Sequence, residues 1–222
     1  MSEGVLYIGH RRYSSWSLRG WLAVRLAGLD VDVRVLRFER PGPTKAIAAL
    51  SPNGLVPFLE HNGARVWESL AICDYCAEIR PALWPADRVA RAHAKSMSAE
   101  MHAGFRELRM AMWMNLGRDF SGLGRTPGAL ADIARIQALW AETRARFAGG
   151  GPFLFGYEFG MADAMFAPVV ARFLGWRPEI SKETADYCAA VRAHPLVAEW
   201  YEGAAAEPDV WLIADYERVP AG

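Results

Sequence analysis

The chain has 222 residues, with 25 basic and 25 acidic side chains and no formal net charge. Proteins that bind nucleic acid or anionic membranes usually carry a basic excess, so this balance argues against both partners. Hydrophobic residues make up 52% of the chain, which is enough for a sizeable core. The N-terminus lacks a signal-peptide pattern, no apolar run is long enough to span a membrane, and the three cysteines are too few for a disulfide scaffold. We therefore expect a soluble cytoplasmic protein.

The first part of the chain alternates between strand and helix patterns. Residues 5–8 form a short apolar run, and residues 31–35 alternate between apolar and charged side chains, which predicts a half-buried strand. A helix is expected between these two strands, because apolar residues there recur at helical spacing: Leu18, Trp21, Leu22 and Leu26.

The same alternation continues to about residue 80. A short helix is expected after Thr44, followed by two strands that meet at Asn62 and Gly63, since Asn-Gly between strand-like runs is typical of a hairpin. A further helix is expected over about residues 69–79. Together these elements predict a small α/β domain at residues 1–80.

The rest of the chain has only helical patterns. Pro81 and Pro85 mark a linker, and Thr126 followed by proline begins a long helix. One long helix is expected across the apolar stripe formed by Met97, Met101, Phe105, Leu108 and Met112. More helices are expected at about residues 161–174, 182–193 and 195–206. The sequence thus predicts an all-α domain at residues 87–222.

Two cysteines have the spacing of a redox or metal motif. Cys73 and Cys76 are three residues apart, but they lie within the expected third helix, whereas a redox pair belongs at the start of a first helix. We interpret them as core residues. A zinc site would need a second ligand pair, which the sequence lacks, so no metal site is predicted.

Three serines cluster where the first helix should begin. Ser14 or Ser15 can serve as the helix N-cap, and the same hydroxyls can instead bind an anion or a thiolate at the helix N-terminus. His10, just before this segment, is expected at the surface.

Three further features favour a ligand site. A proline after Val56 removes a donor where a strand opens, and a cis bond there would leave the Val56 backbone free to pair with an extended ligand. Glu68 and Ser69 precede the third helix and can hold the ammonium and carboxylate of an amino acid. Asp163 stands at the third position of a helix, as in a capping box.

In this order and spacing, these segments resemble those of the glutathione S-transferase family. The resemblance covers nearly the whole chain and implies a thioredoxin-like N-terminal domain followed by an all-helical domain. The SSWSLR segment at residues 14–19 is most similar to that of the zeta class, which includes maleylacetoacetate and maleylpyruvate isomerases. Zeta members usually have cysteine in place of Trp16, and the family usually has serine or threonine in place of Gly160.

The resemblance implies a glutathione transferase that activates the thiol of glutathione, its co-substrate, for attack on a small hydrophobic electrophile. A homodimer is expected. Ser14 is the first choice for the catalytic hydroxyl and Ser15 the second. The remaining glutathione-binding residues implied by the resemblance are Val56, Pro57, Glu68, Ser69 and Lys45, with Arg40 as an alternative to Lys45.

Other interpretations stay open at this point. The protein could be a glutathione-dependent isomerase of the maleylacetoacetate or maleylpyruvate type, or a binding protein of the same fold without turnover. The side chains of Met101, Phe105, Met112 and Trp113 could line a co-substrate site or form core and dimer contacts. One side of the same long helix carries a polar set that could face solvent or the cleft: His102, Arg106 and Arg109.

Overall fold

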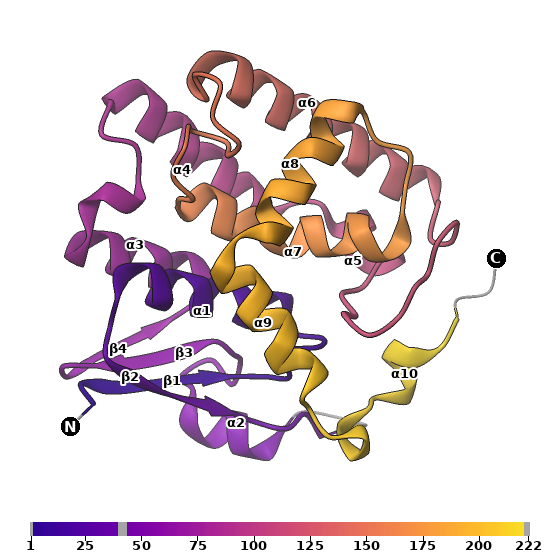
Figure 1. Cartoon of the computed structure of the whole chain (residues 1–222). Helices are drawn as coiled ribbons and strands as arrows, with labels where there is room; N and C mark the ends of the chain where they lie inside the picture. The colour runs from indigo at the N-terminus through magenta and orange to yellow at the C-terminus, as the bar shows by residue number, and fades with distance from the viewer. Residues whose placement is uncertain (1, 40–43, 220–222) are drawn as a thin grey trace.

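The structure is a computed structural model that describes residues 2–39 and 44–219. Its first half is built around a four-stranded sheet of order β2-β1-β3-β4, made of β1 (Gly4–Ile8), β2 (Val31–Val35), β3 (Phe58–His61) and β4 (Ala64–Trp67). β1 pairs parallel to β2 and antiparallel to β3, and β3 pairs antiparallel to β4. Helices α1 (Ser15–Ala27) and α3 (Ser69–Ile79) lie over one face of the sheet, and α2 (Lys45–Leu50) lies on the other side (Figure 1).

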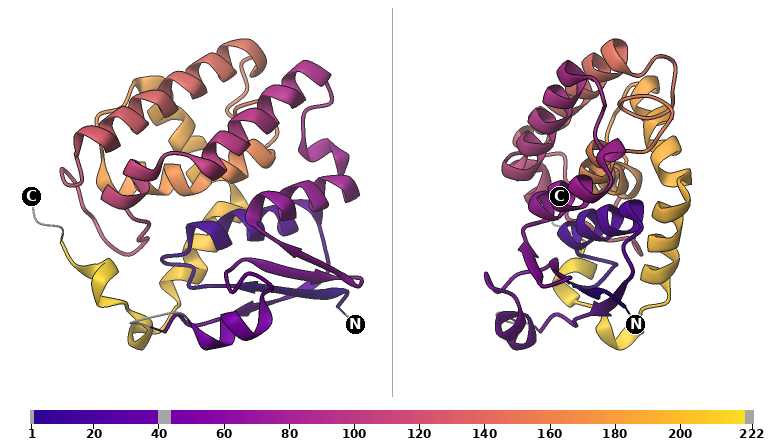
Figure 2. Two further views of the ribbon diagram at one scale, coloured as in Figure 1. Left: turned by 180° about the vertical axis from the view of Figure 1, so that it is seen from behind. Right: turned by 90° about the vertical axis from the view of Figure 1, so that its left-hand side faces the viewer.

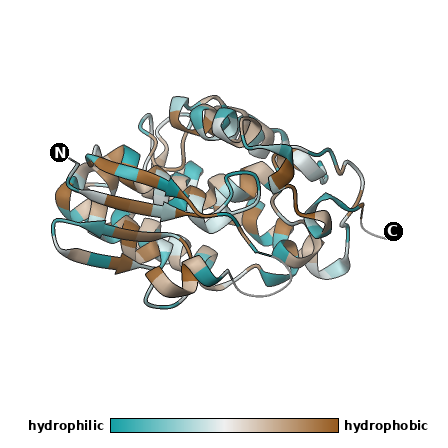
Figure 3. Cartoon of the chain, turned by 90° about the horizontal axis from the view of Figure 1, so that it is seen from below, coloured by the Kyte–Doolittle hydropathy of each residue, from teal (hydrophilic) through white to brown (hydrophobic). Residues whose placement is uncertain are grey.

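Local sequence signals account for these elements. Residues of β2 alternate between half-buried and exposed, as the alternation of valine with Asp32 and Arg34 predicts. Figure 3 shows the corresponding bands of hydrophobic and hydrophilic residues along the strands. Asn62 and Gly63 both have positive φ, 47° and 83°, which is the conformation of the expected hairpin turn. Gly28 ends α1 in the left-handed conformation with φ of 73°.

The second half is helical. Its elements are a 3-10 turn at Pro81–Leu83, α4 (Arg88–Ala103), α5 (Arg106–Ala111), α6 (Pro127–Phe147), α7 (Met161–Trp176), α8 (Lys182–Ala193), α9 (Pro195–Ala205), a 3-10 turn at Asp209–Trp211 and α10 (Ala214–Glu217). α7 runs through the middle of this half and packs against α1, α4 and α8 (Figure 2). All residues of α7 except Leu174 and Gly175 are buried. Within the described residues, no helix is long and apolar enough to cross a membrane.

One buried apolar cluster joins the two halves. It extends from the β1 residues Leu6 and Ile8, through α1, to the helical residues Trp140 and Trp200. Trp21 of α1 meets Trp200 of α9, with ring centroids 5.4 Å apart. Because the cluster is shared, α1 is fixed against both halves at once.

The expected long helix over residues 97–112 is wrong. α4 ends at Ala103, and Phe105 has a left-handed backbone with φ of 56°. The guanidinium of Arg109 turns back and donates to the carbonyls of Met101 and His102, which are among the last carbonyls of α4. These bonds stabilise the break.

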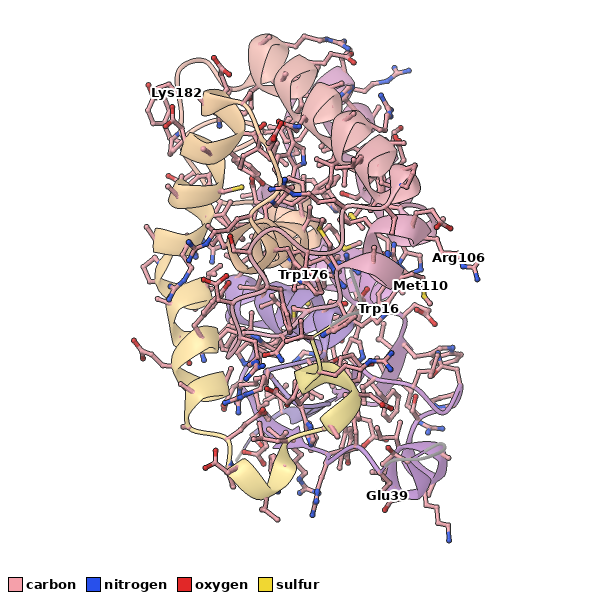
Figure 4. The ribbon with its side chains drawn as sticks, turned by 90° about the vertical axis from the view of Figure 1, so that its right-hand side faces the viewer. Trp16, Glu39, Arg106, Met110, Trp176 and Lys182 are labelled. Atoms are coloured by element: carbon pink, nitrogen blue, oxygen red, sulfur yellow. The ribbon has the colours of Figure 1, made fainter. Side chains whose placement is uncertain are left out.

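The break separates residues that the sequence placed on one helix side. His102 lies at the end of α4, and the exposed Arg106 points away from the molecule next to Met110 (Figure 4). Arg109 turns inward, and the His102 ring packs against Trp16. Met101, Phe105 and Met112 are core residues, with exposed fractions of 0%, 7% and 0%.

Asp163 fixes the start of α7. Its Oδ2 accepts a hydrogen bond from the Gly160 N–H at 3.0 Å, and its Oδ1 accepts from the Leu154 N–H at 3.1 Å and from the Tyr187 hydroxyl at 2.9 Å. The predicted cap is therefore confirmed. Burial raises the pKa of Asp163 to about 6, although these three hydrogen bonds each act to lower it.

Replacing this carboxylate should destabilise the fold. Asp163→Ala leaves two N–H groups and one hydroxyl unsatisfied in the interior, so we expect the free energy of unfolding to fall by about 2–4 kcal/mol. Urea unfolding followed by circular dichroism measures this. Asp186→Ala, which removes an exposed carboxylate of α8 that pairs with Lys182, is the control and should change stability little. Equal stability of Asp163→Ala and the parent would contradict this role.

Candidate active site

A cleft with a volume of about 560 Å³ opens between the two halves. Its lining includes Ser14, Ser15 and Trp16 at the start of α1, Val56 before β3, and Arg109 and Arg172 from α5 and α7. A smaller pocket of about 360 Å³ shares Trp16, Leu55 and Val56 with it and continues to Glu68 and His102. The two pockets therefore form one groove along the Val56 backbone.

Ser14 is the N-cap of α1. Its Oγ accepts a hydrogen bond from the Ser17 N–H at 3.2 Å and donates to the Ser17 Oγ at 2.7 Å. The Ser17 Oγ also accepts a hydrogen bond from the Gly9 N–H at 2.9 Å, which ties the helix start to the end of β1. The hydroxyl hydrogen of Ser14 is thus engaged within the cap.

Ser15 is differently placed. It is the first residue of α1, 8% exposed, and its Oγ lies 3.5 Å from the Arg172 Nη2. Within the described part of the chain this is the one side-chain partner of the Ser15 hydroxyl. An N–H from arginine occupies a lone pair of the oxygen, so the hydroxyl hydrogen of Ser15 remains available to a ligand in the cleft.

Three arginines lie near the start of α1, two of them over the indole of Trp16. Arg19 and Arg109 lie over its ring, with guanidinium carbons 4.6 Å and 4.8 Å from the centroid, and Arg172 lies beside Ser15. Within residues 2–39 and 44–219, none of the three forms an ion pair with a carboxylate at 4.0 Å or less. Positive charge therefore gathers here without a carboxylate in direct contact among the described residues, while the more distant Asp132 of α6 acts on Arg109.

Burial lowers the pKa of these arginines. It lowers the pKa of Arg172 to about 9, with a further contribution from the charge of Arg109. The pKa of the fully buried Arg19 is lowered by burial and then by the charges of Arg109 and Arg172. Each shift has the sign expected when like charges share a site of low dielectric constant. A bound anion would relieve this repulsion.

The Val56-Pro57 peptide bond is cis, as the sequence predicted. Proline packs closely on α1, because a Cβ at Gly20 would lie only 2.7 Å from the Pro57 Cγ. Among the described residues, the backbone N–H and C=O of Val56 have no hydrogen-bond partner. Val56 thus offers both groups to an extended peptide lying in the groove.

Glu68 and Ser69 differ in exposure. Glu68 has a positive φ of 68°, which is unusual for a residue with a Cβ, and its Oε1 accepts a hydrogen bond from the Asn53 Nδ2 at 2.9 Å. Its Oε2 lies 3.8 Å from the His102 Nε2. Ser69 is fully buried behind Glu68, and its Oγ has no partner in the described part of the chain. Only Glu68 lines the groove.

The expected lysine contact is not brought into the cleft. Lys45 is exposed at the start of α2, where its backbone N–H donates to the Glu39 Oε2 at 3.1 Å, and the cleft is lined by Thr44 and Ile47 instead. The alternative residue, Arg40, lies outside the described residues.

The prediction that His10 lies at the surface is wrong. His10 is fully buried, its Nε2 accepts a hydrogen bond from the Phe38 N–H at 3.1 Å, and its ring stacks on Trp211 at 5.2 Å. It sits behind the active segment rather than in the cleft. Burial, with a smaller contribution from the charge of Arg37, lowers the pKa of His10 to about 4.

The cysteine pair is buried in α3, as predicted for core residues. Cys73 and Cys76 are both fully buried, and burial raises the pKa of each thiol. Thiols of this kind are poor nucleophiles. Among the described residues, no group of three or more His, Cys, Asp or Glu side chains could hold a metal ion.

Sequence reasoning missed Arg172 and Arg19. Arg172 and Asp163 are the only charged residues of α7, which is otherwise apolar. An isolated arginine in such a helix could have indicated a functional residue. Arg19 was read only as part of the serine segment. Trp113 was considered, and it does line the cleft.

Two family models match this chain. The glutathione S-transferase N-terminal domain matches residues 13–79, and the glutathione S-transferase C-terminal domain matches residues 127–203. A maleylacetoacetate isomerase from Rhizobium meliloti is 30% identical over 217 residues, covering 87% of this chain and 97% of that protein. A probable maleylacetoacetate isomerase from Caenorhabditis elegans is 27% identical over 203 residues, covering 86% and 92%. The chain belongs to the glutathione S-transferase family.

Solved structures share its fold. A glutathione transferase homologue from a Burkholderia species, with bound glutathione, has a TM-score of 0.68 at 22% identity and covers 92% of this chain and 99% of that one. A tau class glutathione S-transferase from mango, Mangifera indica, has a TM-score of 0.68 at 18% identity and covers 91% and 96%. The predicted thioredoxin-like domain followed by an all-helical domain is thus confirmed.

Burial of His10 makes stability depend on pH. The pKa of about 4 in the folded state lies below the value of about 6.5 expected in the unfolded chain, so protonation favours unfolding. This contribution to stability is present above about pH 6.5 and is lost as pH falls toward about 4. His10→Gln, whose amide oxygen can still accept from the Phe38 N–H, should lose less stability over this range. Urea unfolding at several pH values measures both slopes, and equal slopes would contradict the assignment.

Proposed function

We propose that this protein is a glutathione S-transferase that binds glutathione in the groove and holds its sulfur as thiolate for attack on small electrophiles. The observation that carries this proposal is the Ser15 hydroxyl, which starts α1, faces the cleft and has its hydrogen free for a ligand. The cleft volume of about 560 Å³ lies within the usual range for small-molecule sites.

The groove has partners for each part of glutathione. Ser15 would donate to the sulfur, the Val56 backbone would pair with the cysteinyl residue, and Glu68 would bind the γ-glutamyl ammonium. The free N–H groups at the start of α3 would hold the γ-glutamyl carboxylate. The expected contact from the Ser69 hydroxyl stays a prediction, since this side chain is fully buried. Pro57 keeps this loop against α1. For the glycyl carboxylate the expected residue stays Lys45, whose exposed side chain would have to reach the cleft from the start of α2.

A simple estimate supports thiol activation. A free thiol has a pKa of about 8.5, so little thiolate exists at neutral pH. A hydrogen bond to a charged group contributes about 1.5–3 kcal/mol and a helix N-terminus about 0.3–1 kcal/mol, and about 1.4 kcal/mol corresponds to one pKa unit. Serine and helix together would therefore lower the thiol pKa by about one to three units. The thiol proton leaves to solvent, and the sulfur lone pair forms the bond to the electrophilic carbon. At the same time a leaving group departs with its bonding electron pair, or the π electrons of an activated double bond move onto its electron-withdrawing group.

The helical half would supply the electrophile site. We assign glutathione binding to residues 1–80 and the co-substrate site to residues 87–222, with Trp113, Met114 and Tyr216 as its apolar wall in the cleft. A small hydrophobic electrophile fits this wall. The homodimer and the cytoplasmic location expected from the family remain predictions.

A glutathione-dependent isomerase is the second candidate. The relatives named as maleylacetoacetate isomerases favour it. Trp16 stands where zeta members usually have cysteine, which favours the transferase. A rate panel that includes conjugation electrophiles and a maleyl isomerisation substrate, each with and without glutathione, distinguishes the two activities.

The first prediction concerns binding. The protein should be retained on immobilised glutathione, and Glu68→Ala should weaken glutathione binding about 10- to 100-fold, because it removes the acceptor for the ammonium. Calorimetric titration measures the affinity. Glu78→Ala, which removes an exposed carboxylate at the other end of α3, is the matched control and should bind like the parent. Failure of the parent protein to bind would refute the proposed function.

The second prediction concerns the two serines. Ser15→Ala should lower kcat/KM for conjugation at neutral pH about 10- to 100-fold, because the donor to the sulfur is lost. Ser14→Ala should mainly cost about 1 kcal/mol of stability, as expected for loss of an N-cap. Steady-state kinetics and thermal melting measure the two effects. If Ser14→Ala shows the larger loss of kcat/KM while remaining folded, the donor is Ser14 and the assignment to Ser15 is wrong.

A further inference from the structure

Arg172 is held rigidly at the floor of the cleft. It is 5% exposed, its Nε donates to the Met112 carbonyl at 2.8 Å, and its Nη1 donates to the Pro168 carbonyl at 2.9 Å. Met112 follows the end of α5, and Pro168 lies one turn earlier in α7. These two bonds fix the plane of the guanidinium and direct its remaining nitrogen, Nη2, toward Ser15.

This contact constrains the Ser15 hydroxyl. The hydroxyl has one hydrogen and two acceptor lone pairs, whereas arginine can only donate. With the Arg172 Nη2 on one lone pair, the hydrogen of Ser15 must point elsewhere. None of the described residues accepts this hydrogen. Ser15 lines the cleft, so the hydrogen can point into it. In contrast, the Ser14 hydroxyl donates its hydrogen to the Ser17 Oγ.

Arg172 also brings a charge. A buried charge without a partner is costly, and a buried arginine is usually paired with a carboxylate. The other charged or titratable groups that face it are Arg19 on α1, Arg109 on α5 and Tyr216 on α10. Arg172 and Arg109 both line the cleft together with Ser15, so the cleft holds like charges. A thiolate in the cleft would supply a negative charge to this cluster.

We propose that Arg172 is a positioning residue for thiol activation: its Nη2 donates to the Ser15 Oγ, so that the hydroxyl hydrogen faces the cleft and the sulfur of bound glutathione. Its positive charge then adds to the stabilisation of the thiolate. The inference rests on the proposed function. It assigns to the helical half a direct part in activating the thiol, in addition to lining the co-substrate site.

The test is the pKa of the glutathione thiol in the binary complex, measured by the ultraviolet absorbance of the thiolate as pH is varied. Arg172→Met should raise this pKa by about one to two units, because an opposite charge near the anion is lost. kcat/KM at about pH 6.5 should fall about tenfold or more, and the deficit should disappear at pH values above both thiol pKa values. Arg172→Lys keeps the charge but not the planar set of three donor nitrogens, so its thiol pKa should lie between those of the parent and Arg172→Met.

Controls separate this role from a structural one. Arg144 is an arginine of α6 that also donates to two carbonyls, those of Pro152 and Phe153, but it lies outside the cleft. Arg144→Met should therefore leave the thiol pKa unchanged. If Arg172→Met binds glutathione with an unchanged thiol pKa, the proposal is overturned, although the proposed function stands. If the parent protein binds no glutathione, the proposed function itself is refuted.

A double mutant tests the route through Ser15. If Arg172 acts by orienting this hydroxyl, the shifts caused by Arg172→Lys and Ser15→Ala should add up to more than the shift in the double variant. Strict additivity of the two shifts would overturn the positioning role. Because lysine keeps a charge at this position, this comparison does not depend on the stability of Arg172→Met.

Discussion

A buried arginine determines how the two halves of this protein meet. Arg19 of α1 is 1% exposed, and its Nε donates to the Met165 carbonyl of α7 at 2.8 Å. Burying a charge at this depth is costly, and the Arg19 Nη1 has no hydrogen-bond partner among the described residues. The bond from its Nε ties α1 to α7 at this point. That position brings Ser15 and Arg172 to 3.5 Å. The site therefore depends on the contact between α1 and α7.

The same contact explains the charge of the cleft. α1 and α7 carry arginines toward their common boundary, and α5 adds Arg109. Arg19 and Arg109 lie over Trp16, and Arg172 lies beside Ser15. The whole chain has equal totals of acidic and basic residues, so its net charge does not reveal this local excess of positive charge. Glutathione carries net negative charge, and its thiolate adds more. The neutral chain is thus compatible with a small anionic peptide as its ligand.

Local signals in the sequence predicted much of the fold. The Asn62-Gly63 hairpin and the cap at Thr126 follow from a few adjacent residues, and both are confirmed. The break between α4 and α5 was missed because the apolar spacing continues across it, while its cause is the bond from Arg109 back to α4. His10 was misplaced because its burial depends on stacking against Trp211, far along the chain.

The candidate site shows the same division. Residues in short motifs, such as Ser15, Val56 and Glu68, were found from the sequence and do line the groove. Arg172 was not found, since its partner Ser15 is 157 residues away and no local pattern connects them. The proposal of Ser15 rather than Ser14 as the donor to the sulfur also needed the structure. It depends on which hydroxyl donates its hydrogen within the helix cap.

A crystal structure of the protein with glutathione tests the central claim most directly. We predict that the sulfur lies within hydrogen-bond distance of the Ser15 Oγ, with the cysteinyl backbone paired to Val56 and the γ-glutamyl ammonium on Glu68. Glutathione bound outside this groove, or with its sulfur turned away from Ser15, would contradict the account.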